Sequence, residues 1–301
     1  MQTIVYDVLS QDQCRQLRET LLECGERFGE GHAHRTPQAE GGIGAWHVAN
    51  LPTMARCFHG IIDHPKVLPL VEHFMGKDII LGSLSSRIVR PGDPVQGLHG
   101  DIGQNMIGKD VVGSEVLEAD RGRPLMMNTV WMFQDTGPEI GGTRVVPGSH
   151  MSGMAEVPDG WEPPMVVQPS APAGSVLVYN GHCWHAGGAN TSEDKYRCSA
   201  FGHYRKSLDA YPAFGGRIFQ CDPAAGFPSE WWEGLSQRNK ELLGMTDGPQ
   251  GPPPCASHDP EQHLNGDFGG YQCREFTDGE FELVTEVPGF KETANSPLAR
   301  L

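Results

Sequence analysis

The sequence has no long apolar run, no strongly basic region and no paired cysteine motif. A membrane-spanning helix needs about 18 or more consecutive apolar residues, and none is predicted here. The first residues lack the basic and apolar segments of a secretory signal, so we expect a cytoplasmic protein. Eight scattered cysteines without a C-x-x-C pair then predict reduced thiols rather than a disulfide framework.

Positive charge is also scarce. The chain carries 23 basic and 38 acidic residues, which gives a net charge of −15. An acidic surface repels phosphate backbones and anionic lipids, so we expect neither nucleic-acid nor membrane binding. A local basic pocket inside the acidic shell remains compatible with this balance. The expected partner is a small-molecule substrate, bound by a monomer or a homodimer.

Glycine and proline, in contrast, are abundant. The 39 glycines and 24 prolines mark many turns, which is typical of a mainly-β fold with long connections. Neither an internal repeat nor a clean compositional boundary is visible, so residues 1–301 are predicted to form one domain. Its core is expected over about 1–205. The extension over about 206–301 is expected to be a lid or a subunit contact.

Helices are predicted near the N-terminus. Ser10 and Gln13 have the spacing of a capping box, and apolar residues follow at helical intervals. This first helix is predicted to end at Gly25, because glycine commonly terminates helices. A second helix is predicted over 65–75 and closed by Gly76.

Strands are predicted where apolar runs lie between turn signals. The segment 78–90 is expected to form two strands or one bent strand. Further strand candidates cover 125–133, 174–179 and 196–204, and a short strand with a closing turn is predicted over 143–150. The polar, aperiodic stretch 102–124 lies between two of these candidates, and a loop of this length is predicted to act as an active-site lid.

The first residues that indicate a metal site are His99 and Asp101. If this stretch is a strand, its period of two places both side chains on one face. An imidazole beside a carboxylate supplies two of the three ligands of a 2-His-1-carboxylate site, which binds Fe(II) and leaves positions open for oxygen chemistry. An isolated H-x-D pair is more often a chance neighbourhood, so a third ligand is needed downstream.

Candidates for the missing groups lie in the second half of the chain. His185 precedes a glycine-rich turn, and Arg197 begins a predicted strand. His182 is an alternative third ligand, although the placing of an asparagine and a serine after His185 favours the latter. Arg205 is an alternative to Arg197.

Together with a second block of motifs, these residues resemble the phytanoyl-CoA dioxygenase family of Fe(II)/2-oxoglutarate oxygenases. The block consists of the apolar segment from Trp131 to Asp135, then Gly141-Gly142-Thr143, then Val146-Pro147-Gly148-Ser149-His150. The motifs occur in the order of that family, and the resemblance runs from about Ser10 to Tyr204.

The resemblance implies a double-stranded β-helix, a cupin-like jelly-roll barrel with flanking N-terminal helices. It implies that Fe(II) is bound by His99, Asp101 and His185. It also implies that Arg197 pairs with the distal carboxylate of 2-oxoglutarate, a role suited to a planar, bidentate cation. Further residues that would help to hold the cosubstrate are Thr143, Gln96 and Asn128.

The implied activity is that of a dioxygenase that uses Fe(II), 2-oxoglutarate and O2. It would oxidise an unactivated C–H bond of a small molecule, most simply by hydroxylation, with release of succinate and CO2. A role in natural-product biosynthesis fits, and desaturation and cyclisation remain open. Halogenation is disfavoured because the family's halogenating members leave open the position that Asp101 would occupy.

Two readings from other classes compete with this one. Two histidines and a carboxylate also suit catalytic zinc in a cupin-like protein, although a zinc hydrolase has no need of Arg197. A catalytically silent jelly-roll protein would be expected to have lost a ligand or the arginine, and this chain retains all four.

Overall fold

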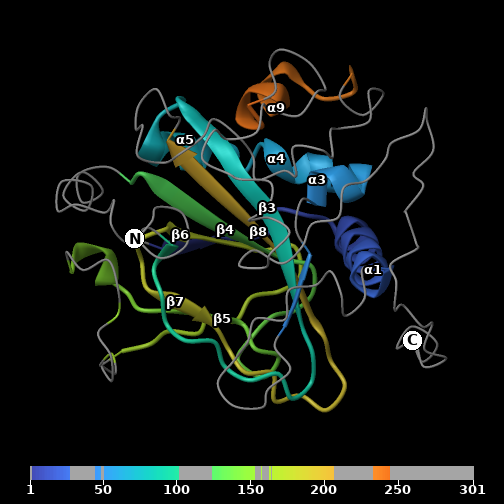
Figure 1. Ribbon diagram of the computed structural model, residues 1–301, viewed down its shortest axis with the longest axis vertical. Coiled ribbons are helices and arrows are strands. Elements are labelled where there is room, and N and C mark those ends of the chain that lie inside the picture. The colour runs from blue at the N-terminus through green and yellow to red at the C-terminus, as the bar shows by residue number, and fades with distance from the viewer. Residues whose placement is uncertain are drawn as a thin grey trace, which may run out of the picture.

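The computed structural model describes residues 2–27, 45–48, 51–101, 124–152, 157, 163, 165–206 and 233–244. Two antiparallel sheets form the centre of this described part (Figure 1). The larger sheet has the order β1-β6-β4-β8-β3-β2, in which strands that are adjacent in space are distant in sequence. The smaller sheet pairs β5 with β7.

The strands of the larger sheet have these bounds: β1 Gln2–Val5, β2 Trp46–Val48, β3 Ile79–Val89, β4 Met126–Met132, β6 Val176–Asn180 and β8 Arg197–Lys206. Those of the smaller sheet are β5 Thr143–Val145 and β7 His185–Gly187. The predicted strands over 125–133, 174–179 and 196–204 are therefore confirmed. The segment 78–90 forms the single strand β3, whose register with β8 shifts between Leu81 and Ser83.

Helices pack against one side of the larger sheet. They are α1 Gln11–Arg27, α3 Leu51–Met54, α4 His59–Ile62, α5 Leu68–Met75 and α9 Gln237–Leu242, with a short 3-10 turn at Arg56–Phe58 (η1). A second 3-10 turn, Ser149–Met151 (η2), contacts the segment before β7 instead, where Ser149 Oγ accepts from the Trp184 N–H at 2.7 Å. Figure 1 shows α1, α3, α4 and α5 on one side of the sheet and β5 and β7 on the other. We call the helix-covered side the outer face and the opposite side the inner face.

The two faces bury different residues. Strand alternation directs Met127 and Trp131 of β4 to the outer face, where a large apolar cluster joins sheet and helices. Val130 and Met132 belong to a smaller apolar cluster on the inner face, together with Leu177 of β6. The larger core of the protein therefore lies between helices and sheet, and a smaller one lies between the two sheets.

The start of α1 follows the predicted capping box. The Gln13 backbone N–H donates to Ser10 Oγ at 3.2 Å, and the Ser10 backbone N–H donates to Gln13 Oε1 at 2.9 Å. The predicted end at Gly25 is wrong, because α1 continues to Arg27. Gly25 instead permits close packing, since a Cβ there would lie 2.6 Å from Ile88 Cδ1.

The predicted helix over 65–75 appears as α5, and Gly76 closes it with a φ of 81°. No described helix is both long and apolar enough to cross a bilayer. The five cysteines in the described ranges are free thiols. The proposed lid over 102–124 falls almost wholly outside the residues that the structure describes.

Part of the predicted C-terminal extension packs on the outer face. Leu242 and Leu243 at the end of α9 are fully buried in the large apolar cluster. Ser236 Oγ donates to Asp63 Oδ2 at 2.9 Å, and Arg238 Nη2 donates to Glu72 Oε1 at 2.7 Å. This segment therefore belongs to the core that the N-terminal helices make, on the side of the sheet away from β5 and β7.

Candidate metal centre

The segments that carry His99 and His185 are joined by their backbones. The His99 N–H donates to the His185 carbonyl at 2.9 Å, and the His185 N–H donates to the His99 carbonyl at 2.8 Å. The expectation of a strand through 99–101 is wrong, because His99 makes only this single antiparallel bridge. The flanking glycines, Gly97 and Gly100, do not favour an extended ladder. The bridge places the two imidazoles side by side instead.

Asp101 is positioned by a different backbone contact. Its N–H donates to the Gly181 carbonyl at 2.9 Å, just before the turn that leads into β7. Gly100 packs close to this turn, because a Cβ built on it would lie in van der Waals contact with the His182 carbonyl oxygen, at 3.4 Å. The carboxylate is buried, with 6% of Asp101 exposed.

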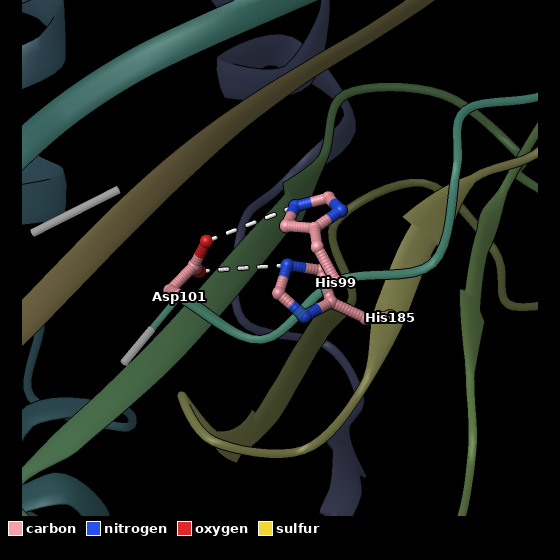
Figure 2. A group of neighbouring side chains, drawn as sticks. All are labelled: His99, Asp101 and His185. Carbon is pink, nitrogen blue, oxygen red and sulfur yellow. Dashed lines mark ion pairs between the residues drawn. The ribbon is translucent and has the colours of Figure 1, made fainter. Parts of the chain in front are cut away.

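The three side chains converge on one point (Figure 2). His185 Nε2 lies 3.4 Å from Asp101 Oδ2, and His99 Nε2 lies 3.8 Å from Asp101 Oδ1. The ligand atoms of all three residues lie within 4.8 Å of one another. They form the only such cluster of histidine, cysteine and acidic side chains in the part of the chain that the structure describes.

Each imidazole is oriented by its other nitrogen. His99 Nδ1 lies 2.9 Å from the Gly97 carbonyl oxygen, and His185 Nδ1 lies 2.9 Å from the Cys183 carbonyl oxygen. A carbonyl only accepts, so Nδ1–H is the donor in both cases. Each Nε2 then presents a lone pair toward the cluster, which is the arrangement that histidine ligands of metals show.

Burial sets the protonation of this cluster. It lowers the pKa of His185 to about 4, although Asp101 acts in the opposite direction. His185 is therefore neutral at pH 7. Burial on its own raises the pKa of Asp101, but the imidazoles of His185, His203 and His99 and the hydrogen bond from Asn128 outweigh it and hold this pKa well below its usual value. The site therefore contains a carboxylate beside a neutral imidazole.

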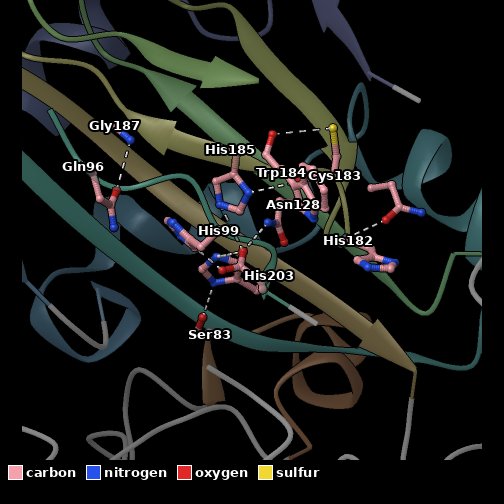
Figure 3. A network of polar contacts seen from close by, with 12 residues as sticks. Ser83, Gln96, His99, Asn128, His182, Cys183, Trp184, His185, Gly187 and His203 are labelled. Carbon is pink, nitrogen blue, oxygen red and sulfur yellow. Dashed lines mark hydrogen bonds and ion pairs between the residues drawn. The ribbon is translucent and has the colours of Figure 1, made fainter. Parts of the chain in front are cut away.

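Further side-chain contacts hold the Asp101 carboxylate in place. Asn128 Nδ2 donates to Asp101 Oδ2 at 2.5 Å, and His203 Nε2 lies 3.6 Å from the same oxygen. His203 Nδ1 in turn lies 2.5 Å from Ser83 Oγ (Figure 3). Sequence reasoning missed His203 and Ser83. The period of two along β8, counted from Arg197, could have placed His203 on the same face.

A small pocket lies where the segment before His99 meets β7 and β8, and none of the three clustered residues lines it. Its lining includes Gln96, Gly187, Arg197 and Arg87. Gln96 Oε1 accepts from the Gly187 N–H at 3.1 Å, which ties the segment before His99 to β7. Arg197 is 1% exposed, and its Nη1 donates to the Gly141 carbonyl. Burial, followed by the positive charge of Arg87, lowers the pKa of Arg197 to about 10, so the guanidinium stays charged at pH 7.

The remaining candidates are placed as follows. Thr143 is buried in β5 and does not itself line the pocket, but it pairs with Gly187, which does. His182 is fully buried but lies outside the cluster of ligand atoms. Arg205 lies at the far end of β8, opposite Met126, and does not line the pocket of Arg197.

Residues 2–198 of the chain match the family described as phytanoyl-CoA dioxygenase (PhyH). Among curated proteins, dioxygenase af480 of Aspergillus fumigatus is 28% identical over 197 residues. The match covers 65% of this chain and 57% of af480, so this chain spans less than two thirds of that relative.

Two solved structures have a similar fold. One is the non-haem alpha ketoglutarate dependent epimerase SnoN from nogalamycin biosynthesis, with a TM-score of 0.54 and 18% identity over 68% of this chain and 78% of that one. The other is the carbocyclase SnoK from the same pathway, with a TM-score of 0.53 and 16% identity over 68% of this chain and 79% of that one. The prediction of a cupin-like jelly roll is confirmed by this likeness.

Proposed function

This chain belongs to the phytanoyl-CoA dioxygenase family, and we propose that it is a non-haem Fe(II)/2-oxoglutarate-dependent dioxygenase that hydroxylates an unactivated C–H bond of a small molecule. The observation that carries this proposal is the convergence of His99, Asp101 and His185 beside a pocket that contains a buried arginine. Two imidazoles and one carboxylate form the ligand set of non-haem Fe(II) oxygenases.

The residues present fit an iron ion. Both Nε2 atoms face the cluster because both Nδ1 atoms donate to backbone carbonyls. Asp101 is held in place by the hydrogen bond from Asn128, and its carboxylate would serve as the anionic ligand. His99, Asp101 and His185 would hold the ion, and a set of only three protein ligands would leave room for cosubstrate and oxygen. Fe(II) with 2-oxoglutarate and O2 supplies the oxidising chemistry, with succinate and CO2 as co-products.

The pocket beside the cluster suits a dicarboxylate. Arg197 is buried, charged and close to Gln96, so it can pair with the distal carboxylate of 2-oxoglutarate. Thr143 and Gln96 border the same region and are proposed to hold the cosubstrate as well. The amide nitrogen of Asn128 is engaged by Asp101, so this residue is proposed to assist through its amide oxygen.

The relatives support a small-molecule substrate. SnoN and SnoK are alpha ketoglutarate dependent enzymes of nogalamycin biosynthesis, and af480 is a dioxygenase. SnoN is an epimerase and SnoK a carbocyclase, so one architecture serves different reactions. We propose hydroxylation for this chain, in natural-product biosynthesis, because it needs no second functional group on the substrate.

The test is an anaerobic titration of the metal-free protein with Fe(II) and then with 2-oxoglutarate. We expect a visible charge-transfer band that saturates with 2-oxoglutarate, and conversion of 2-oxoglutarate to succinate once O2 is admitted. Arg197→Ala should weaken 2-oxoglutarate binding at least roughly tenfold, the loss of one charge-assisted hydrogen bond, while Fe(II) still binds. A protein that binds Zn(II) tightly but gives no band with Fe(II) and 2-oxoglutarate would contradict the proposal.

A further inference from the structure

The pocket next to the metal centre contains a second arginine whose place follows from strand pairing. In the register of β3 with β8, Val89 lies opposite Arg197, and Arg87 lies opposite Ser199. Further along the same strands, Ser83 lies opposite His203, which contacts Asp101. Arg87 therefore stands on the inner face between the level of Arg197 and the level of the metal centre.

Both arginines face the same space. Arg87 and Arg197 line one pocket, together with Gln96, Gly187 and Gly188. The Cα of Gly187 faces both Arg197 and Gln96, because a Cβ built on it would lie 3.8 Å from Arg197 Nη1 and 3.4 Å from Gln96 Oε1, in ordinary van der Waals contact with both. The described lining of the pocket thus has two arginines and no acidic residue.

Two buried polar atoms on this part of the inner face have no hydrogen-bond partner in the described part of the chain. Arg197 Nε and Ser199 Oγ are buried without a hydrogen-bond partner among the described residues. Leaving a buried donor unsatisfied is unfavourable, and native proteins seldom do so without a ligand or a water. Because Arg87 lies opposite Ser199, these orphan atoms and the second guanidinium belong to one place on the sheet.

The charges lead to the same conclusion. Burial lowers the pKa of Arg87, and the carboxylate of Asp101 acts against this shift. The positive charge of Arg87 in turn contributes to the lowered pKa of Arg197. Arg87 thus interacts electrostatically with both the metal-centre carboxylate and the anchor. Two guanidinium groups that line one buried pocket repel each other, and an anionic ligand between them would relieve that repulsion.

We propose that Arg87 is a second 2-oxoglutarate-binding residue, which with Arg197 makes a doubly cationic pocket for this dicarboxylate. The inference rests on the proposed function, since it takes 2-oxoglutarate as the cosubstrate. A ligand that reaches from the metal toward Arg197 passes the level of Arg87, and its two negative charges match the two guanidinium groups. The pocket thereby concentrates a dianion inside a protein whose net charge is −15.

The experiment measures equilibrium binding of 2-oxoglutarate to the Fe(II)-loaded protein under anaerobic conditions, by calorimetry and by the visible band. The variants are Arg87→Gln, which removes the charge, and Arg87→Lys, which keeps it. Arg15→Gln serves as a matched control, because Arg15 lies on α1 with 65% of its side chain exposed. Circular dichroism and Fe(II) affinity establish that each variant retains its fold and its metal centre.

We expect Arg87→Gln to weaken 2-oxoglutarate binding roughly 10- to 100-fold, as expected for one charge-assisted contact, with Fe(II) affinity unchanged. Arg87→Lys should recover part of this loss, and Arg15→Gln should bind like the parent. If the parent binds 2-oxoglutarate and Arg87→Gln binds it equally well, the inference is wrong while the proposed function stands. If Arg87→Gln keeps its 2-oxoglutarate affinity but loses substrate oxidation, Arg87 belongs to the substrate site and the inference is again overturned. If the parent itself fails to bind 2-oxoglutarate, the proposed function fails first.

Discussion

The two faces of the six-stranded sheet are made by alternate residues of the same strands, yet their chemistry differs. On β8, Cys198, Ala200 and Tyr204 belong to the apolar cluster beneath the helices. Their neighbours Arg197 and His203 face the pocket and the metal centre. The period of two thus lets one strand carry stabilising residues and functional residues without mixing them.

The difference has an energetic meaning. Apolar burial on the outer face contributes about 25 cal/mol per Å² removed from water, with little need for precise orientation. The inner face buries charged and polar groups, which is unfavourable unless each has a partner. Stability therefore resides mainly on the outer face, and the inner face can tolerate groups whose partners are ligands. Substitutions on one face at a time test whether stability and metal binding are divided between the two faces in this way.

The largest effect is expected at the centre of the inner face. Asp101→Asn removes the only carboxylate in the described cluster and replaces one ligand oxygen with an amide. We expect Fe(II) affinity to fall by more than the roughly 10- to 100-fold typical of outer-shell changes, and product formation to be lost. Fe(II) calorimetry and circular dichroism measure affinity and fold. Asp12→Asn, at an exposed position of α1, is the control. If Asp101→Asn bound Fe(II) as tightly as the parent does, the assignment of Asp101 as a metal ligand would be wrong.

On the outer face, Trp131→Ala should lower the free energy of unfolding by about 3–5 kcal/mol. Trp131 is fully buried, and its ring makes an edge contact with His64 at 5.6 Å between centroids. Denaturant unfolding monitored by far-ultraviolet circular dichroism measures the loss. The folded Trp131→Ala protein should bind Fe(II) nearly as tightly as the parent. A large drop in its Fe(II) affinity would show that a change on the outer face also disturbs the metal centre.

Neighbouring residues of β4 give a sharper comparison. Asn128 holds Asp101 on the inner face, whereas Thr129 on the outer face donates to the Gly202 carbonyl at 3.1 Å and accepts from Trp131 Nε1 at 3.0 Å. Asn128→Ala should weaken Fe(II) binding roughly 10- to 100-fold. Thr129→Ala should leave Fe(II) binding unchanged and reduce stability by about 1–3 kcal/mol. Calorimetry measures Fe(II) affinity and denaturant unfolding measures stability in both variants. If Thr129→Ala weakened Fe(II) binding while Asn128→Ala only lowered stability, the division between the two faces would be refuted.

The smallest effects are expected from another adjacent pair, on β8. Tyr204→Phe removes the hydroxyl that donates to the Ile62 carbonyl at 2.8 Å, which should reduce stability by about 1 kcal/mol and leave the metal centre intact. His203→Gln removes the imidazole between Ser83 and Asp101. It should change the visible band of the Fe(II)–2-oxoglutarate complex, because the carboxylate ligand loses a neighbour. An unchanged band in His203→Gln would remove that residue from the site.

Local patterns predicted much of this molecule. The capping box at Ser10 and the apolar strands are visible in sequence because they depend on residues close together in the chain. Gly25 was misjudged, since its place inside α1 depends on packing against Ile88, which no local pattern reveals. The strand expected at 99–101 was wrong for a related reason: two glycines interrupt it, and a partner 86 residues away positions His99.

The residues of the candidate site likewise fall into those that the sequence reveals and those that it does not. His99, Asp101 and His185 were predicted because their motifs are recognisable in the chain, and the structure brings them together. Arg87, Ser83 and His203 were missed, because their importance arises only when β3 pairs with β8. That pairing joins segments about a hundred residues apart, and its register cannot be read from either strand alone.

The reciprocal backbone bonds between His99 and His185 have a consequence for metal choice. Because the polypeptide itself holds both imidazoles in place, little conformational entropy remains to be lost when an ion arrives. A site that is already formed undergoes no conformational change on binding, so it cannot use such a change to reject other divalent ions. Affinity for divalent ions then follows the Irving–Williams order, in which copper, nickel and zinc bind more tightly than iron. Occupancy by iron would thus depend on which metals the surroundings supply, and mismetallation becomes an intrinsic hazard of this architecture.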